Sequence, residues 1–106
     1  MKLIELTDKT IDIYLNNRTK STVIIDFWST TCNPCKAMMP FIEQIADEYS
    51  DLPIAKLNVS EFTELADAFG VYSVPTIVIF KNGKEVDRLI GLKSKSNIKD
   101  FIDKNL

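Results

Sequence analysis

The sequence predicts an α/β protein in which a mixed β-sheet carries helices on both faces. Two observations support this prediction. Apolar runs with strand character alternate with segments of helical spacing through the first two thirds of the chain. Asn82-Gly83 then joins two further strand-like runs, which is the signature of a two-residue hairpin, and a segment of helical spacing follows. The alternation favours parallel pairing and the hairpin requires an antiparallel pair, so the sheet is mixed.

The elements of the first half follow from residue types and spacing. Asp8 is a candidate N-cap for a first helix whose apolar face is formed by Ile11, Tyr14 and Leu15. Residues 22–28 predict a buried strand because β-branched and aromatic side chains dominate them. The next helix is predicted from apolar side chains that recur at three- and four-residue steps, namely Cys35, Met38, Met39, Ile42, Ile45, Ala46 and Tyr49.

The second half contains three strand-like runs and two helical segments. The strand-like runs are residues 53–58, 76–80 and 85–90. Ser60 is a candidate N-cap for a short helix, and Gly70 is placed to end that helix. From Ser94 onward a last helix is predicted, with a buried face formed by Ile98, Phe101 and Ile102.

Composition and charge exclude several classes of protein. A chain of 106 residues, 45% hydrophobic and 26% charged, is expected to form one domain spanning residues 1–106. A formal net charge of −2, with acids and lysines interspersed, gives no electrostatic case for binding nucleic acid or a membrane surface. Glu5 interrupts the apolar stretch that a signal peptide would need, so we expect a cytoplasmic protein. In that compartment a cysteine pair is more often catalytic or metal-binding than structural.

Cys32-Asn33-Pro34-Cys35 stands where the strand at 22–28 gives way to a helix, and it contains the only two cysteines. As a zinc site it is incomplete, because structural zinc takes four ligands and the chain has no histidine. A zinc site shared between chains remains an alternative. As a structural crosslink it would close a loop so short that it removes only about 2 kcal/mol of chain entropy. As a redox couple it fits, because a C-x-x-C pair can cycle between dithiol and disulfide.

The spacing gives the two cysteines unequal positions. Pro34 suits the first turn of a helix, where its missing N–H costs nothing. Cys32 therefore lies beside the free N–H groups and the positive dipole end of that helix, which favour the thiolate over the thiol. Cys35 lies one turn further in and is more shielded. We expect Cys32 to attack a substrate disulfide and Cys35 to resolve the mixed disulfide, with a base to take the Cys35 proton.

These residues and their surroundings resemble the thioredoxin family over essentially the whole chain. The matching motifs are Asp26-Phe27-Trp28, Cys32-x-Pro34-Cys35-Lys36, Pro40, Val74-Pro75-Thr76, Phe80-Lys81-Asn82-Gly83 and Gly91. The resemblance implies the thioredoxin fold, a central mixed sheet flanked by four helices, and protein-disulfide reduction as the activity. Two positions depart from the family pattern: Asn33 stands where glycine is usual, and Thr31 stands where tryptophan is usual.

The residues between the cysteines bound the redox potential. Oxidising relatives place a histidine there, and a protonated histidine would stabilise the Cys32 thiolate and hence the reduced form. Asn33 and Pro34 carry no charge. The family potentials of thioredoxins and of protein disulfide isomerases differ by about 90 mV, or roughly 4 kcal/mol, which one neutral side chain is not expected to supply. We therefore predict a reductant with a potential below about −200 mV.

Asp26 is the only charged residue in its strand, and a buried carboxylate is costly and tends to have a raised pKa. The resemblance implies that Asp26 accepts the Cys35 proton through water. The alternative is a carboxylate at a wet strand end or bonded to backbone. Lys56 in the next strand either tunes the Asp26 pKa or extends to solvent.

The remaining candidate residues are expected to bind the substrate. The resemblance implies that Pro75 is cis and lies opposite the cysteines, which would leave the Val74 backbone to pair with an extended substrate segment; the alternative is an ordinary strand-edge proline. Gly91 either lets the substrate chain approach or forms a simple bulge. Trp28, the only tryptophan, packs beside the cysteines or belongs to the core. The expected substrate-binding set is Trp28, Asn33, Pro34, Val74, Pro75 and Gly91.

The resemblance also implies partners. These are a flavoprotein thioredoxin reductase, drawing on NADPH or ferredoxin, and oxidised proteins as substrates. The expected function is that of a monomeric thiol–disulfide oxidoreductase with no bound cofactor or metal. The rival hypothesis is a redox-silent binding subunit built on the same fold, against which the intact residues Cys32, Cys35, Asp26 and Pro75 argue.

Overall fold

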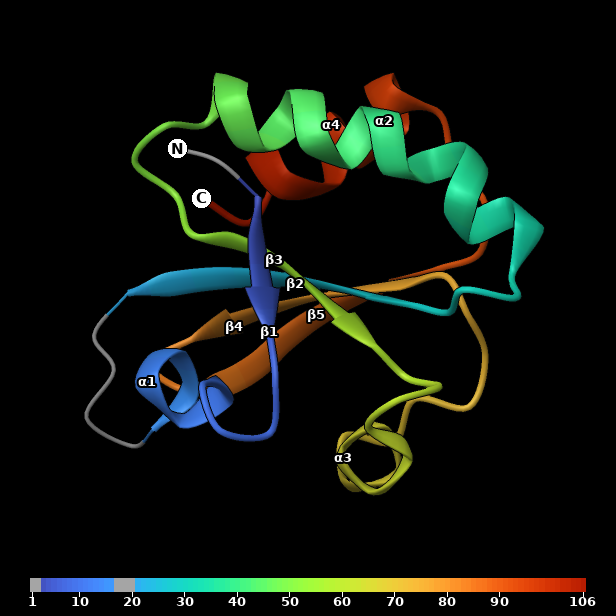
Figure 1. Cartoon of the computed structure of the whole chain (residues 1–106). Coiled ribbons are helices and arrows are strands. Elements are labelled where there is room, and N and C mark those ends of the chain that lie inside the picture. The colour runs from blue at the N-terminus through green and yellow to red at the C-terminus, as the bar shows by residue number, and fades with distance from the viewer. Residues whose placement is uncertain (1–2, 17–20) are drawn as a thin grey trace.

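The computed structural model describes residues 3–16 and 21–106 of the chain. Within these ranges a five-stranded sheet has the strand order β1-β3-β2-β4-β5 (Figure 1). The strands are β1 (Ile4–Leu6), β2 (Thr22–Trp28), β3 (Ile54–Asn58), β4 (Thr76–Lys81) and β5 (Lys84–Ile90). The helices are α1 (Ile11–Leu15), α2 (Asn33–Glu48), α3 (Thr63–Ala68) and α4 (Lys95–Asp103).

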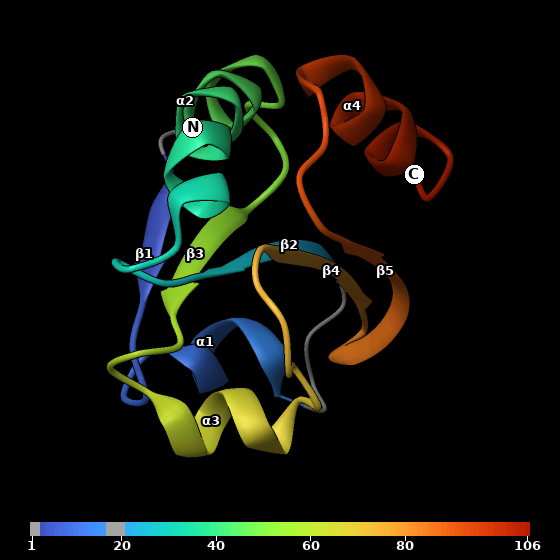
Figure 2. The ribbon, with the colours of Figure 1, turned by 90° about the vertical axis from the view of Figure 1, so that its right-hand side faces the viewer.

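The sheet is mixed, as the sequence predicts. β3 pairs in parallel with β1 and β2, whereas β4 pairs antiparallel with β2 and β5. α2 and α4 cover one face of the sheet, and α1 and α3 cover the other (Figure 1, Figure 2). The predicted α/β class, with helices on both faces, is confirmed. In the described part of the chain, no helix has the length and apolar character needed to cross a membrane.

β2 divides its side chains between two cores because successive residues of a strand point to opposite faces. Val23, Ile25 and Phe27 lie in the core shared with α1 and α3. Ile24 lies in the other core, with residues of α2 and α4. Asp26 shares the face of Ile24 and is paired with β3 on one side and β4 on the other. The alternation therefore places a carboxyl group at the centre of the sheet, on the face that α2 covers.

Several predicted local signals are confirmed. Asn82 and Gly83 both have positive φ, 55° and 79°, as a two-residue hairpin turn between twisted strands requires. The last helix, predicted from Ser94 onward, begins one residue later, and Ser94 is its N-cap, with Oγ accepting a hydrogen bond from Asn97 N at 3.1 Å. Gly70 has a φ of 67° and lies just beyond the end of α3.

The predicted N-cap at Asp8 is wrong. α1 begins at Ile11, preceded by Thr10, and Asp8 lies within the turn before it. Two threonines close that turn: Ile11 N donates to the Thr7 carbonyl at 3.0 Å, and Thr7 N donates to Thr10 Oγ1 at 2.9 Å. The turn before α1 is thus closed by the Thr7 carbonyl and the Thr10 hydroxyl, on either side of Asp8.

The predicted N-cap at Ser60 is also wrong. α3 begins at Thr63 and has no side-chain cap. Ser60 N donates to Asn58 Oδ1 at 3.0 Å, and Ser60 Oγ lies 2.5 Å from Ser29 Oγ. The Ser60 hydroxyl is therefore occupied by a residue of another loop.

β1 is absent from the sequence-based prediction. It has three residues, and within the described ranges it pairs with β3 alone, at an edge of the sheet. So short a segment cannot be recognised from alternation alone. Met39 and Tyr49, predicted on the buried face of α2, pack against the core but are only partly buried.

Candidate functional site

A disulfide lies at the junction between β2 and α2. It joins Cys32, the N-cap residue of α2, to Cys35, and the two Cα atoms are 5.3 Å apart. Cys35 N donates to Cys32 Sγ at 3.2 Å. Pro34 occupies the first turn, where an N–H would have no intrahelical partner. Cys32 Sγ therefore lies after the end of β2, at the positive N-terminal end of α2.

The two sulfurs differ in exposure. Cys35 is completely buried, at 0% exposed, whereas Cys32 is partly exposed and is followed by the exposed residues Asn33 and Pro34. Cys32 Sγ lies 3.8 Å from the Val74 carbonyl oxygen, in the loop before β4. An incoming group can therefore reach Cys32, beside Val74, but not Cys35.

Asp26 is buried, at 1% exposed. Burial raises its pKa to about 7, and the nearby Lys56 charge, a smaller effect, lowers it. Neither carboxyl oxygen has a hydrogen-bond partner within residues 3–16 and 21–106. The alternative of a wet or backbone-bonded carboxylate is therefore wrong. A carboxyl group with this pKa can both take up and release a proton near neutral pH.

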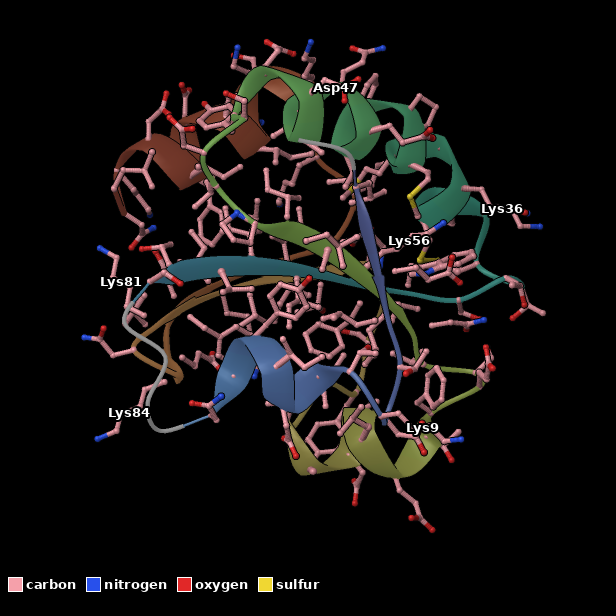
Figure 3. All side chains as sticks on the ribbon, turned by 60° about the vertical axis from the view of Figure 1, so that its left-hand side comes forward. Lys9, Lys36, Asp47, Lys56, Lys81 and Lys84 are labelled. Atoms are coloured by element: carbon pink, nitrogen blue, oxygen red, sulfur yellow. A yellow bond between two sulfur atoms is a disulfide. The ribbon has the colours of Figure 1, made fainter. Side chains whose placement is uncertain are left out.

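Lys56 links Asp26 to Trp28. It is the register partner of Asp26 on the neighbouring strand β3, and parallel register partners point to the same face. Its Nζ lies 5.1 Å from the centroid of the Trp28 ring, within the range of a cation–π interaction. Trp28 is partly exposed, so it is not simply a core residue. Figure 3 shows Lys56 at the same end of the molecule as Lys36, the residue after Cys35.

The Val74–Pro75 peptide bond is cis, as the resemblance implies. Two hydrogen bonds hold this loop. Thr76 Oγ1 donates to the Ser73 carbonyl at 2.7 Å, and Gly91 N donates to the Pro75 carbonyl at 2.9 Å. The loop opposite Cys32 is therefore fixed from β4 and from the residue that follows β5.

Gly91 has a φ of 97°, which residues with a side chain rarely adopt. A Cβ placed there would meet no heavy atom within 4 Å, so backbone conformation rather than crowding requires glycine. Its neighbours Ile90 and Leu92 are 53% and 57% exposed. The expectation that a substrate chain approaches closely at Gly91 stays a prediction.

Ser29 is not predicted from the sequence, and Ser60 is predicted as a helix cap but lies elsewhere. Ser29 is buried in the loop between β2 and α2, and its hydroxyl contacts those of Thr31 and Ser60. The run Ser29-Thr30-Thr31 before Cys32 is a local signal for such contacts. No local sequence pattern indicates that Ser60, in the loop between β3 and α3, is the partner of Ser29.

This arrangement defines a class of protein, because a half-exposed disulfide at a strand–helix junction is a redox couple for thiol–disulfide exchange. Residues 2–104 match the family model described as Thioredoxin. The chain belongs to the thioredoxin family, and the resemblance is confirmed. It is a thiol–disulfide oxidoreductase of the protein-disulfide reductase type, with Cys32 and Cys35 as its redox-active pair.

Individual relatives match over nearly the whole chain. The thioredoxin of Buchnera aphidicola subsp. Acyrthosiphon pisum is 38% identical over 106 residues, covering 99% of this chain and 97% of that protein. The thioredoxin of Chlorobaculum thiosulfatiphilum is 41% identical over 106 residues, with the same coverage of 99% and 97%. Among solved structures, thioredoxin NaTrxh from Nicotiana alata matches with a TM-score of 0.89 and 32% identity, covering 97% of this chain and 91% of that one.

Proposed function

We propose that Cys32 is the attacking sulfur and Cys35 the resolving sulfur of this reductase. The observation that supports these roles is the difference in exposure: Cys32 is partly exposed at the helix N-terminus, and Cys35 is 0% exposed. The positive end of α2 and the N–H of Cys35 both stabilise negative charge on Cys32 Sγ once the disulfide is reduced.

The reaction proceeds by two exchanges. The Cys32 thiolate attacks one sulfur of a substrate disulfide, so that a Cys32–substrate bond forms, the substrate S–S bond breaks, and the leaving thiolate takes up a proton. Cys35 then loses its proton and attacks Cys32 Sγ. The Cys32–Cys35 bond forms as the Cys32–substrate bond breaks, the second substrate sulfur leaves as a thiolate that takes up a proton, and two electrons have passed to the substrate.

Asp26 is the proposed acceptor of the Cys35 proton, through water. Three properties support the role: it lies on the face that α2 covers, it has no hydrogen-bond partner among the described residues, and its pKa is about 7. A base is most effective when its pKa lies near the working pH. Lys56 tunes this base, because its charge lowers the Asp26 pKa.

An extended substrate segment is proposed to bind beside Cys32 by pairing with the backbone of Val74. The 3.8 Å between Cys32 Sγ and the Val74 carbonyl oxygen supports this, since a strand paired there brings its own sulfur close to Cys32. The proposed substrate-binding residues are Trp28, Asn33, Pro34, Val74, Pro75 and Gly91.

The reductase partner, the protein substrates, the location and the oligomeric state are inferred from the family. A flavoprotein reductase, linked to NADPH or to ferredoxin, would return the pair to the dithiol, and oxidised cytoplasmic proteins would be the substrates of a monomeric protein. The uncharged pair Asn33 and Pro34 supports a reducing potential. Equilibration with glutathione measures that potential, and a value above about −200 mV would contradict a reductant.

Insulin reduction tests the roles of the cysteines. With a chemical reductant as electron source, wild type should accelerate insulin reduction and Cys32→Ser should abolish the acceleration. Incubated with insulin without that reductant, Cys35→Ser should accumulate a mixed disulfide through Cys32, visible by mass spectrometry. A wild type no faster than the reductant alone would favour the redox-silent binding subunit, and a mixed disulfide on Cys35 in Cys32→Ser would reverse the two roles.

A further inference from the structure

Three hydroxyl groups meet beside Cys32. Ser29, three positions before Cys32, is 6% exposed. Its Oγ lies 3.1 Å from Thr31 Oγ1 and 2.5 Å from Ser60 Oγ, and it accepts a hydrogen bond from Thr31 N at 3.3 Å. The hydroxyl groups of Ser29, Thr31 and Ser60 form a hydroxyl cluster. It joins the loop between β2 and α2 to the loop between β3 and α3.

The Ser29 hydroxyl is saturated. A serine hydroxyl offers one donated hydrogen and two acceptor positions. One acceptor position receives Thr31 N, and the remaining donor and acceptor serve the Thr31 and Ser60 hydroxyls. A buried group with every position used has one favourable orientation, so Ser29 ties the two loops together through their side chains.

Backbone hydrogen bonds connect this cluster to the nucleophile. Cys32 N donates to the Ser29 carbonyl at 3.2 Å, and Thr31 N donates to Ser29 Oγ. Ser29 therefore binds Thr31 through its side chain and Cys32 through its main chain. On the other loop, Ser60 N is bonded to Asn58 Oδ1 at 3.0 Å, and Val59 N is bonded to the Trp28 carbonyl at 2.8 Å. Ser60 therefore stands on a turn that is itself tied to the sheet.

We propose that the hydroxyl cluster positions Cys32 for attack, with Ser29 and Ser60 as positioning residues. Neither residue is placed at the reacting sulfur, so their effect passes through the loop that carries it. Thiolate attack on a disulfide demands alignment, and a displacement of about 1 Å at a reacting atom can cost roughly a hundredfold in rate. The inference takes from the proposed function that Cys32 is the attacking sulfur.

The test measures second-order rate constants of the reduced protein at neutral pH and room temperature. The substrates are hydroxyethyl disulfide, which is small, and insulin, which is a protein. Ser60→Ala and Ser29→Ala should slow both reactions by roughly threefold to tenfold. Ser60→Thr, which keeps the hydroxyl, should stay within about twofold of wild type. Ser96→Ala, at an exposed position of α4, is the matched control and should match wild type.

The double variant separates a shared bond from two unrelated effects. Because Ser29→Ala and Ser60→Ala remove the same hydrogen bond, the double variant should be no slower than the slower single variant, whereas independent effects would multiply. The Cys32 thiolate pKa, followed by ultraviolet absorbance, should not move, because the cluster acts on position and not on charge.

Four outcomes would overturn the proposal. They are a wild-type rate in Ser60→Ala, no recovery in Ser60→Thr, multiplied losses in the double variant, or a thiolate pKa change large enough to account for the slower rate. Ser60 is exposed, so Ser60→Ala gives an answer even if Ser29→Ala fails to fold. A wild-type protein that does not reduce insulin would instead refute the proposed function.

Discussion

Asp26 and Ser29 are buried polar residues only three positions apart, and the fold treats them in opposite ways. Asp26 is 1% exposed, and its carboxyl oxygens have no partner in the ranges described. Ser29 is 6% exposed, and its hydroxyl makes all the contacts it can. Burying a polar group costs free energy unless a partner replaces water. The fold gives no partner from the described residues to the group proposed to move a proton, whereas it surrounds the group proposed to hold a loop with hydrogen bonds.

The largest expected effect comes from removing the unsatisfied carboxyl group. Between pH of about 4 and about 7 the unfolded chain has lost the Asp26 proton while the folded protein keeps it. The free energy of unfolding of wild type therefore falls as pH rises through this window, by about 4 kcal/mol at roughly 1.4 kcal/mol per pH unit. Asp26→Asn lacks this loss, so urea unfolding should find it about 2–4 kcal/mol more stable than wild type above the folded pKa.

Turnover provides the second measurement on the same variant. Without the base, Asp26→Asn should reduce insulin at least about tenfold more slowly than wild type near neutral pH. Asp47→Asn removes an exposed acid on α2 and is the control, expected to change neither stability nor turnover appreciably (Figure 3). Unchanged unfolding and unchanged turnover in Asp26→Asn would show that Asp26 is not a buried base.

Ser29→Ala should give a smaller effect of opposite sign. It removes a saturated hydroxyl and leaves Thr31 N without its bond to Ser29 Oγ, so urea unfolding should show a loss of about 1–2 kcal/mol. Because no titrating group is removed, the loss should be the same at acidic and neutral pH. Ser96→Ala should lie within about 0.5 kcal/mol of wild type. A gain of stability in Ser29→Ala would mean that its hydrogen bonds do not offset the cost of burying it.

The environment of Asp26 can be predicted from the sequence, whereas that of Ser29 cannot. Asp26 interrupts an apolar run, so its burial and raised pKa can be predicted from composition and strand pattern. The contacts of Ser29 depend on Ser60, which lies 31 positions away. Local spacing instead predicts Ser60 as the cap of the nearest helix, because a sequence pattern depends on residues that are close along the chain. It contains no information on residues that are close only in space.

The same difference between local and long-range contacts separates the elements that the sequence predicts from those that it does not. β2 and β4 are predictable because long runs of β-branched residues allow few alternatives, and the hairpin is predictable because Asn82-Gly83 accepts positive φ. β1 is not predictable, because three residues become a strand only when β3 is beside them. The cis bond at Pro75 follows from the family resemblance, since the residue types alone favour trans.

The smallest expected effect comes from Lys56, which connects the unsatisfied carboxyl group to its surroundings. Its charge lowers the Asp26 pKa against the larger effect of burial. Lys56→Met keeps a long apolar side chain near Trp28 but removes the charge, so the Asp26 pKa should rise further. Less Asp26 is then ionised at neutral pH, and insulin turnover should fall by roughly twofold to fivefold and recover as pH is raised.

A control variant that loses a lysine charge far from Asp26 shows whether the effect comes from the Lys56–Asp26 pair or from the net charge of the protein. Lys84→Met removes an exposed lysine on the side of the molecule away from Lys56 and should leave the pH profile in place (Figure 3). Comparing the pH dependence of unfolding in Lys56→Met, with and without Asp26→Asn, gives the Asp26 pKa directly. If that midpoint does not rise, Lys56 does not tune the base, and its contribution is confined to the 5.1 Å contact with the Trp28 ring.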